Sequence, residues 1–286
     1  MFIVAIIDCR FRPHTESILR GLTESPIFRE GLLASGLDLD EYVAGAESVP
    51  KICKDLRAFG IEKAILVGRD AETTYGFKPN NDELKKFVEE DPHLFCAFAG
   101  LDPHKGMQAV RTLDHLVKEE GFVGAATDPI YNQLPIDHAK FYPIYAKCCE
   151  LDIPIVITTG PARFTEGTVS AFAHPDQIDR IANDFPELRV IVSHGAWPYI
   201  SEMVGCAFRN KNVYVECSEY EKFPGSEAFI EAAKGILQDR VVFASAHPFV
   251  HYKDAVALYD GFGFADDVKE KIMYKNAKRE IGRAHV

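Results

Sequence analysis

Residues 174–203, "HPDQIDRIANDFPELRVIVSHGAWPYISEM", predict a helix, then a buried strand, then a second helix. The first helix is expected to end before Pro186, because proline cannot continue a helix. The strand, 189–194, has an apolar centre, as a parallel strand covered on both faces must have. His194 is therefore expected where this strand opens into a loop.

The same alternation of strand and helix runs along the whole chain. Eight short apolar segments are predicted as strands: 2–8, 63–68, 94–100, 122–127, 153–158, 189–194, 212–217 and 240–245. Helical patterns lie between them at 48–60, 81–92, 107–121, 138–154, 174–186, 196–209 and 226–237, and a tail helix pair follows at 253–282. Such alternation predicts parallel pairing with right-handed crossovers.

We therefore expect an α/β fold, a (β/α)8 TIM barrel that forms a single domain over residues 1–286. Residues 9–47 would form a long first connection that covers the mouth of the barrel. A doubly wound open sheet is the alternative, although no strand is followed by a glycine-rich dinucleotide motif or a P-loop.

The composition excludes several functional classes. The chain has 286 residues and a net charge of −11, which argues against nonspecific nucleic-acid binding. No stretch approaches the roughly 18 apolar residues of a membrane span, and "MFIVAII" (1–7) lacks the flanks of a signal peptide. The seven cysteines show no CxxC spacing, which favours free thiols and predicts a cytoplasmic protein.

Polar side chains gather at the predicted carboxyl ends of the strands, where barrels of this kind carry out their chemistry. In chain order these are Asp8, Arg10 and Arg12; Gly68, Arg69 and Asp70; Thr127 and Asp128; Thr158 and Thr159; Ser193, His194 and Trp197; Glu216, Ser218 and Glu219; and Ala246 and His247. Asp8, Arg10 and Arg12 share one strand parity, so all three are expected to face the interior.

In this order, the segments resemble the amidohydrolase superfamily. The resemblance is closest to the branch that includes aminocarboxymuconate-semialdehyde decarboxylase and the hydroxybenzoate decarboxylases. Residues 174–203 are the most specific part, followed by "NKNVYVECS" (210–218), "DRVVFASAHPF" (239–249), "GFVGAATDP" (121–129) and "IPIVITTG" (153–160). The resemblance covers nearly the whole chain. It implies a TIM barrel, hydrolysis or decarboxylation of a small substrate, and a possible homodimer.

The chain departs from the family pattern at the metal ligands. The resemblance implies a His-x-His pair on strand one, histidines on strands five and six, and an aspartate on strand eight. Here Arg10 and Arg12 stand at the pair, Thr158 at the fifth-strand histidine and Ala246 at the aspartate, and only His194 is kept. Arginine does not ligate cations. We therefore expect neither the family's metal nor another cofactor.

Two guanidinium groups can supply the missing positive charge and fork onto a carboxylate. The superfamily has a metal-independent branch, the pyrone dicarboxylate lactonase type, that is similar in holding acidic substrates this way. That branch keeps the aspartate that Ala246 replaces here, so the resemblance supports anion binding more than lactone hydrolysis.

The predicted site has catalytic and binding residues. His194 would transfer a proton, with Asp128 orienting it, and His247 could act as a proton shuttle. The predicted substrate-binding residues are Arg10, Arg12, Arg69, Thr158, Thr159 and Trp197. Plainer interpretations stand beside these: an ion pair of Asp8 with the arginines that plugs the barrel, a solvated Arg69, a capping Asp128, and a His194 satisfied by neighbouring backbone. Cys9 and Cys217 lack a visible base, so a thiol nucleophile is not expected.

Three functions follow as hypotheses. The leading one is a metal-independent, amidohydrolase-like hydrolase or decarboxylase for a small anionic, cyclic or aromatic carboxylate. The second is a non-catalytic barrel that binds a small acid. The third is a metal-dependent hydrolase with an altered ligand set of Asp8, His194 and Glu216 or His247. In each case the partner is a small molecule, and neither nucleic acid nor membrane is expected.

Overall fold

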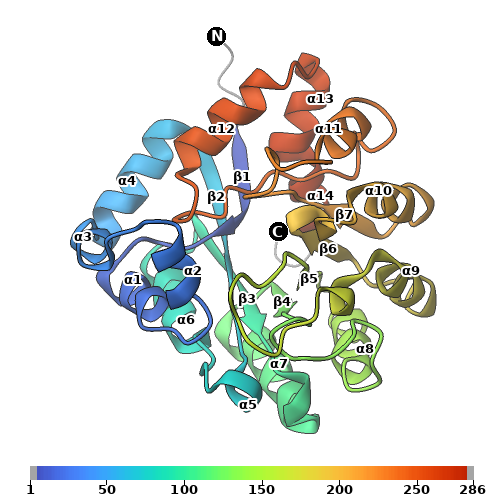
Figure 1. Ribbon diagram of the computed structural model, residues 1–286, viewed down its shortest axis with the longest axis horizontal. Coiled ribbons are helices and arrows are strands. Elements are labelled where there is room, and N and C mark those ends of the chain that lie inside the picture. Colours follow the sequence, from blue (N-terminus) through green and yellow to red (C-terminus); the bar gives the residue numbers. More distant parts are fainter. Residues whose placement is uncertain (1–4, 282–286) are drawn as a thin grey trace.

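The computed structural model describes residues 5–281 and places seven parallel strands in one curled sheet whose order follows the sequence. The strands are β1 (Ile6–Phe11), β2 (Ile61–Val67), β3 (Phe95–Gly100), β4 (Gly124–Thr127), β5 (Ile155–Thr158), β6 (Val190–Ser193) and β7 (Val213–Val215). Figure 1 shows them at the centre of the molecule with helices around them. This is an α/β, TIM-barrel-like fold. Residues 2–4 of the predicted first strand lie outside the described residues.

The eighth predicted strand, 240–245, is not a regular strand. It makes one isolated parallel bridge, Val241 with Val215 on the β7 side, and beyond its end His247 forms a second one with Phe11 on the β1 side. Two of its backbone amides bond elsewhere, that of Phe243 to a helix carbonyl and that of Ser245 to an aspartate side chain. The prediction of eight regular strands is corrected to seven, because these diverted amides interrupt a continuous ladder.

The helices follow the strands as the alternation predicts. They are α1 (Glu16–Thr23), α2 (Arg29–Ala34), α3 (Leu39–Ala44), α4 (Val49–Phe59), α5 (Glu72–Tyr75), α6 (Asn81–Glu90), α7 (Met107–Glu120), α8 (Tyr142–Glu150), α9 (Pro175–Asp184), α10 (Ile200–Arg209), α11 (Glu227–Lys234), α12 (Tyr252–Gly261), α13 (Asp266–Glu270) and α14 (Asn276–Ile281). Short turns of other helix types are η1 (Pro103–Lys105), η2 (Ser170–Ala173), η3 (His194–Ala196) and η4 (Lys271–Lys275).

The predicted helix boundaries are close to the observed ones where a stop residue is present. Gly60 ends α4 in the left-handed conformation, with φ +100°, as glycine at this position favours. The predicted tail pair corresponds to α12 and to the run from α13 through α14, and residue 282 lies outside the described part of the chain. No helix within residues 5–281 has the length and apolar character needed to cross a membrane.

The core has two layers. An inner cluster joins alternate strand residues, among them Cys9, Val67, Phe98 and Ile191, with Ala277 and Ile281 from α14. A larger outer cluster packs the other strand faces against the surrounding helices. The strands are therefore buried on both sides, which explains their nearly continuous apolar sequences. The polar residues at the carboxyl ends stand above the inner cluster.

Candidate active site

The end of β1 departs from simple alternation. Its pairing with β2 shifts register between Asp8 and Phe11, an irregularity of the β-bulge kind, which re-aims side chains. Cys9 belongs to the inner apolar cluster, whereas Asp8 accepts hydrogen bonds from the backbone N (2.9 Å) and the hydroxyl of Ser245. The prediction that Asp8 faces the interior together with both arginines is wrong, because the register shift breaks their common parity.

Arg10 is buried without a counter-ion. It is 2% exposed, its guanidinium lies 3.4 Å from the hydroxyl of Thr158 on β5, and its Nε has no hydrogen-bond partner. Within residues 5–281, no carboxylate forms an ion pair with Arg10 or Arg12. The predicted ion pair that plugs the barrel with Asp8 is therefore absent from the described structure. A buried guanidinium without an anion is costly to the fold and favours an anionic ligand.

Arg12 adds a second positive charge next to the first. It is half-buried, and its guanidinium carbon lies 5.5 Å from the centroid of the Phe249 ring. Burial, and then the repulsion of Arg10 and Arg69, lowers the pKa of Arg12 to about 9. An anion placed between the two arginines would reverse this unfavourable repulsion.

Arg69 is already neutralised. It pairs with Asp128 at 2.8 Å, and its guanidinium contacts the rings of both Phe28 (4.7 Å to the centroid) and Tyr131 (4.8 Å). Burial opposes the charge of Arg69, but Asp128 outweighs it and the pKa is raised. The expectation that Asp128 orients His194 is corrected: Asp128 orients Arg69, because the loop after β4 brings its carboxylate to the guanidinium.

His194 lies at the end of β6 with a left-handed backbone, φ +66°. Its Nδ1 donates to the carbonyl oxygen of Ser218 at 2.8 Å, which leaves Nε2 as an acceptor. Burial, then Arg10, lowers the pKa of His194 well below its usual value, so the ring is neutral. Gly160 makes room for it, since a Cβ at that position would lie 2.9 Å from the ring.

The two threonines of β5 differ in use. Thr158 accepts from Arg10, as described above. The hydroxyl of Thr159 donates to the carbonyl oxygen of Ser193 and accepts from the backbone N of Ala196 at 2.9 Å. Its predicted role in substrate binding is therefore corrected to bracing the turn that carries His194.

Trp197 packs at the rim. It stacks on Tyr220 with ring centroids 5.7 Å apart and donates from Nε1 to the carbonyl oxygen of Pro224 at 3.1 Å. This placement agrees with an aromatic residue at the mouth, although its indole face is already covered by Tyr220.

His247 lies apart from His194. Its Nε2 is 2.8 Å from Nδ1 of His14, and its ring stacks on Phe11 at 4.8 Å. Burial lowers the pKa of His247 to about 2. The predicted proton shuttle beside His194 is corrected, because the chain after Ala246 turns this ring into an aromatic cluster beside β1.

Glu219 is the residue that sequence reasoning missed. It stood among the residues at the strand ends, but no role was predicted for it. Its carboxylate lies 3.6 Å from Nδ1 of His194, and its side chain is 27% exposed. Burial raises the pKa of Glu219 to about 7, while Arg10 and Arg12 counteract this rise. Phe28 and Tyr131, which enclose Arg69, were missed as well, since neither lies at the end of a predicted strand.

The donor set does not fit the divalent metal that the family pattern implies. Arg10 and Arg12 are cations, Ala246 has no donor atom, and Nδ1 of His194 is engaged with a carbonyl. In the described part of the chain, no group of three or more His, Cys, Asp or Glu side chains is placed to hold a metal ion.

The altered ligand set is not assembled either. The carboxylate of Glu216 accepts from the hydroxyl of Ser193 and the backbone N of Ser218, Asp8 is bonded to Ser245, and His247 to His14. Burial also raises the pKa of the Cys9 and Cys217 thiols well above the usual value, which makes both poor nucleophiles.

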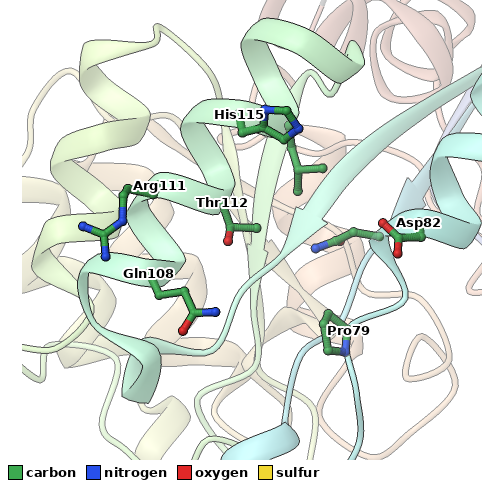
Figure 2. Close-up of a pocket in the computed structure, with 8 residues that line it drawn as sticks. Pro79, Asp82, Gln108, Arg111, Thr112 and His115 are labelled. Atoms are coloured by element: carbon green, nitrogen blue, oxygen red, sulfur yellow. The ribbon is translucent and has the colours of Figure 1, made fainter.

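A separate hollow lies between α6 and α7. Figure 2 shows Gln108, Arg111, Thr112 and His115 along α7, with Pro79 and Asp82 on the opposite side. These residues come from helices and a loop rather than from strand ends. We therefore place the candidate site at the arginines and His194.

Comparison with known proteins gives relatives of similar architecture. The chain is 27% identical over 188 residues to decarboxylase orsB of Emericella nidulans, which is 52% of this chain and 57% of that protein. It is 23% identical over 246 residues to the gamma-resorcylate decarboxylase of a Polaromonas species, 69% of this chain and 73% of that one. The alignment thus spans little more than half of the fungal relative.

Among solved structures, an uncharacterised TIM-barrel protein, Bb4693 of Bordetella bronchiseptica, superposes with a TM-score of 0.80 and 27% identity. The superposition covers 98% of this chain and 99% of that one. The sequence profile of the amidohydrolase family matches residues 35–283. With this match over most of its length, the chain belongs to the amidohydrolase family.

Proposed function

We propose that the protein is a decarboxylase that acts on a small, flat, anionic carboxylic acid and binds the anion with arginines in place of a metal. The observation that carries this proposal is the pair Arg10 and Arg12, two adjacent guanidiniums without ion-pair partners in the described structure, beside a neutral His194. Two of the curated relatives are named decarboxylases, and a third, 30% identical over 139 residues, is named 2-keto-4-carboxy-3-hexenedioate hydratase.

The missing side chain at Ala246 favours decarboxylation over hydrolysis. Hydrolysis in this family requires a group that activates water, and the methyl group of Ala246 cannot take a proton. Decarboxylation needs no bound water. It needs an anion site, stabilisation of the electron pair that the leaving CO₂ releases, and a proton for the carbon that loses CO₂.

Each residue then has a defined task. Arg10 and Arg12 bind the acid and stabilise negative charge on its oxygens. The neutral Nε2 of His194 accepts a hydrogen bond or a proton from a substrate hydroxyl. Arg69, fixed by Asp128, holds the aromatic side chains of Phe28 and Tyr131 over the site.

The test is turnover and binding with a panel of hydroxybenzoates that includes gamma-resorcylate, plus a cyclic ester dicarboxylate. Products are identified by mass spectrometry and CO₂ release. Arg10→Met and Arg12→Met should each weaken binding about 10- to 100-fold, the scale of a lost charged hydrogen bond. Arg111→Met, on the exposed face of α7, is the matched control and should bind like the unmodified protein.

Three other outcomes decide against the proposal. Ester cleavage without CO₂ release would make the protein a hydrolase. Tight binding of an acid without turnover would support the non-catalytic barrel, for which Ala246 also speaks. Equal binding by the arginine variants and the control would remove the anion site altogether.

A further inference from the structure

We propose that Glu219 is the proton donor of this reaction and gives its carboxyl proton to the carbon that loses CO₂. This inference rests on the proposed function and deepens it by naming the acid. It concerns a residue to which neither the family pattern nor the predicted site gave a role.

The segment after β7 separates two glutamates that are close in sequence. Glu216 is 1% exposed and fixed, since its carboxylate accepts from the hydroxyl of Ser193 and from the backbone N of Ser218 at 2.7 Å. The side chain of Glu219 is instead partly exposed and near His194, with no hydrogen bond to the described residues at its carboxylate. Of the two, only Glu219 is free to meet a ligand.

The backbone at Glu219 argues against a purely structural role. Its φ is +72°, in the left-handed region that costs an L-residue roughly 1–2 kcal/mol and that glycine adopts freely. Glycine would serve the turn better. A glutamate at this position is therefore explained by its side chain, in keeping with the strain found at functional sites.

The charges around Glu219 suit a carboxyl group that changes its protonation state. The groups that face it are Arg10 and Arg12 from the end of β1, Arg69 after β2, His194 after β6, Tyr131 after β4, Tyr42 of α3, and Glu216, Tyr220 and Glu221 of its own segment. Burial makes the ionised form unfavourable and the arginines make it accessible. With a pKa of about 7, Glu219 can both give up and regain a proton near neutral pH.

The step balances in atoms and charge. The bond between the carboxyl carbon and the ring carbon breaks, CO₂ leaves, and the electron pair remains with the ring. The ring carbon takes the proton of Glu219, which becomes a carboxylate. The negative charge thus passes from the substrate to Glu219, so Arg10 and Arg12 face one anion before and after the step. Water then reprotonates Glu219.

The experiment compares Glu219→Gln, Glu219→Asp and, as matched control, Glu202→Gln, whose side chain is exposed on α10. With the decarboxylated acid, Glu219→Gln should lower kcat about 10²–10⁴-fold, the range of a general acid, while the Kd of gamma-resorcylate changes less than about threefold. Glu219→Asp should restore part of the rate. In the unmodified protein, kcat/KM should fall as pH rises through about 7, because the donor is the protonated form of the free enzyme; this fall should disappear in Glu219→Gln.

A second readout needs no turnover. Binding of the gamma-resorcylate anion should raise the pKa of Glu219 further, so calorimetry at pH 7.5 in buffers of different ionisation enthalpy should detect proton uptake. Glu219→Gln should remove that uptake, whereas Glu202→Gln should keep it.

The outcomes separate the two proposals. If the arginine variants lose binding and turnover while Glu219→Gln keeps its rate, its pH profile and its proton uptake, the assignment of Glu219 is overturned and the proposed function stands. If no acid is decarboxylated, the proposed function and the donor role fail together, whatever the calorimetry shows. Equal losses in binding and rate for Glu219→Gln would also overturn the donor role, because they indicate a binding residue.

Discussion

The site combines two arginines, which form no ion pair within residues 5–281, with a neutral histidine. Arg10 has an unbonded Nε, Arg12 has a lowered pKa, and His194 is kept neutral by burial and by these arginines. A metal would need neutral or anionic ligands at the same positions. Two fixed cations suit an anionic ligand, and together with burial they keep His194 neutral, while the hydrogen bond from Nδ1 to Ser218 leaves Nε2 as the acceptor.

His194→Asn tests this neutral imidazole. Asparagine keeps the shape and can still donate to the carbonyl oxygen of Ser218, but it cannot take a proton. With an acid that the enzyme decarboxylates, we expect a loss of about 10²–10⁴ in kcat, the range of a general acid–base residue, and little change in stability. His115→Asn, on the exposed face of α7, is the control. Full activity of His194→Asn would make His194 a relic of the family's metal site.

The strain at Glu219 gives a second prediction. Glu219→Gly and Glu219→Ala both remove the carboxyl group, but only glycine relieves a φ of +72°. Glycine should therefore give the more stable protein, by about 1 kcal/mol in urea unfolding, although both variants should lose activity. In unstrained positions the order is reversed, because glycine loses more freedom on folding. A more stable alanine variant would contradict the strain.

The sequence predicted the positions of the site residues better than their contacts, because each contact depends on which other strand a residue meets. Arg10, Arg12 and His194 lie at the ends of β1 and β6, where the strand pattern predicted them, and their roles stay predictions. Thr159 and Asp128 also lie at strand ends, yet their partners, Ser193 and Arg69, come from other strands and cannot be read from spacing. The prediction that Asp8 faces the interior rested on strand parity, and the register shift in β1 breaks that parity.

At the scale of elements, the alternation of helices and strands was sufficient for the barrel-like order β1 to β7. The same alternation wrongly predicted a regular strand at residues 240–245. These residues have the apolar pattern of a strand, but some of their backbone amides bond to other groups. Apolar periodicity reports burial, and this segment is buried. Regular pairing depends on which carbonyls the neighbours offer, and here Asp8 and Ile272 capture two amides.

Two connections meet over the arginines. The hydroxyl of Thr165, in the loop after β5, donates to the carbonyl oxygen of Ile27 before α2 at 3.1 Å, and Arg163 donates to Ser35 at 3.0 Å. Figure 1 shows that loop crossing in front of the strand ends. Arg10 and His194 are almost fully buried, and we predict that these connections separate to admit a ligand to them.

Phe28 fastens this cover, because it contacts Arg69, Tyr131 and Phe249. Phe28→Ala should loosen it, so proteolysis within residues 25–36 should become faster and the KM for the acid should rise about 10-fold, with a smaller change in kcat. Phe208→Ala is the control, since that side chain is 65% exposed on α10. Unchanged KM and proteolysis in Phe28→Ala would show that the two connections are held by other contacts.

At the scale of the whole molecule, the chain combines a net charge of −11 with three acids, two buried and one partly exposed, that resist ionisation. Burial raises the pKa of Asp8 and of Glu219 to about 7, and that of Glu221 to about 8. Their unfolded-state values are near 4. Such groups contribute stability while they are protonated and lose it as pH rises through the folded pKa.

Four histidines act in the opposite direction. The folded pKa values of His14, His194, His247 and His251 are all lowered, so the unfolded chain binds more protons than the folded one at acidic pH. Their contribution is lost as pH falls below about 6.5, the unfolded value. The histidines therefore limit stability below neutral pH, and the three carboxyl groups limit it above neutral pH.

Between pH 6.5 and 8.5, the three carboxyl groups should determine how the free energy of unfolding changes with pH. The three raised carboxyl pKa values lower the free energy of unfolding by about 3 kcal/mol over this interval. The lowered histidine pKa values raise it by about 1–2 kcal/mol, because the histidines of the unfolded chain lose their protons there. The net loss should lower Tm by a few degrees, measured by thermal unfolding in buffers of equal ionic strength.

Glu221→Gln should remove about half of the carboxyl contribution, because Glu221 has the highest pKa of the three, whereas Glu202→Gln should leave the pH dependence unchanged. A Tm that stays level or rises from pH 6.5 to 8.5 would mean that these carboxyls ionise in the folded protein at ordinary pH, and that the arginines already draw a full negative charge onto Glu219.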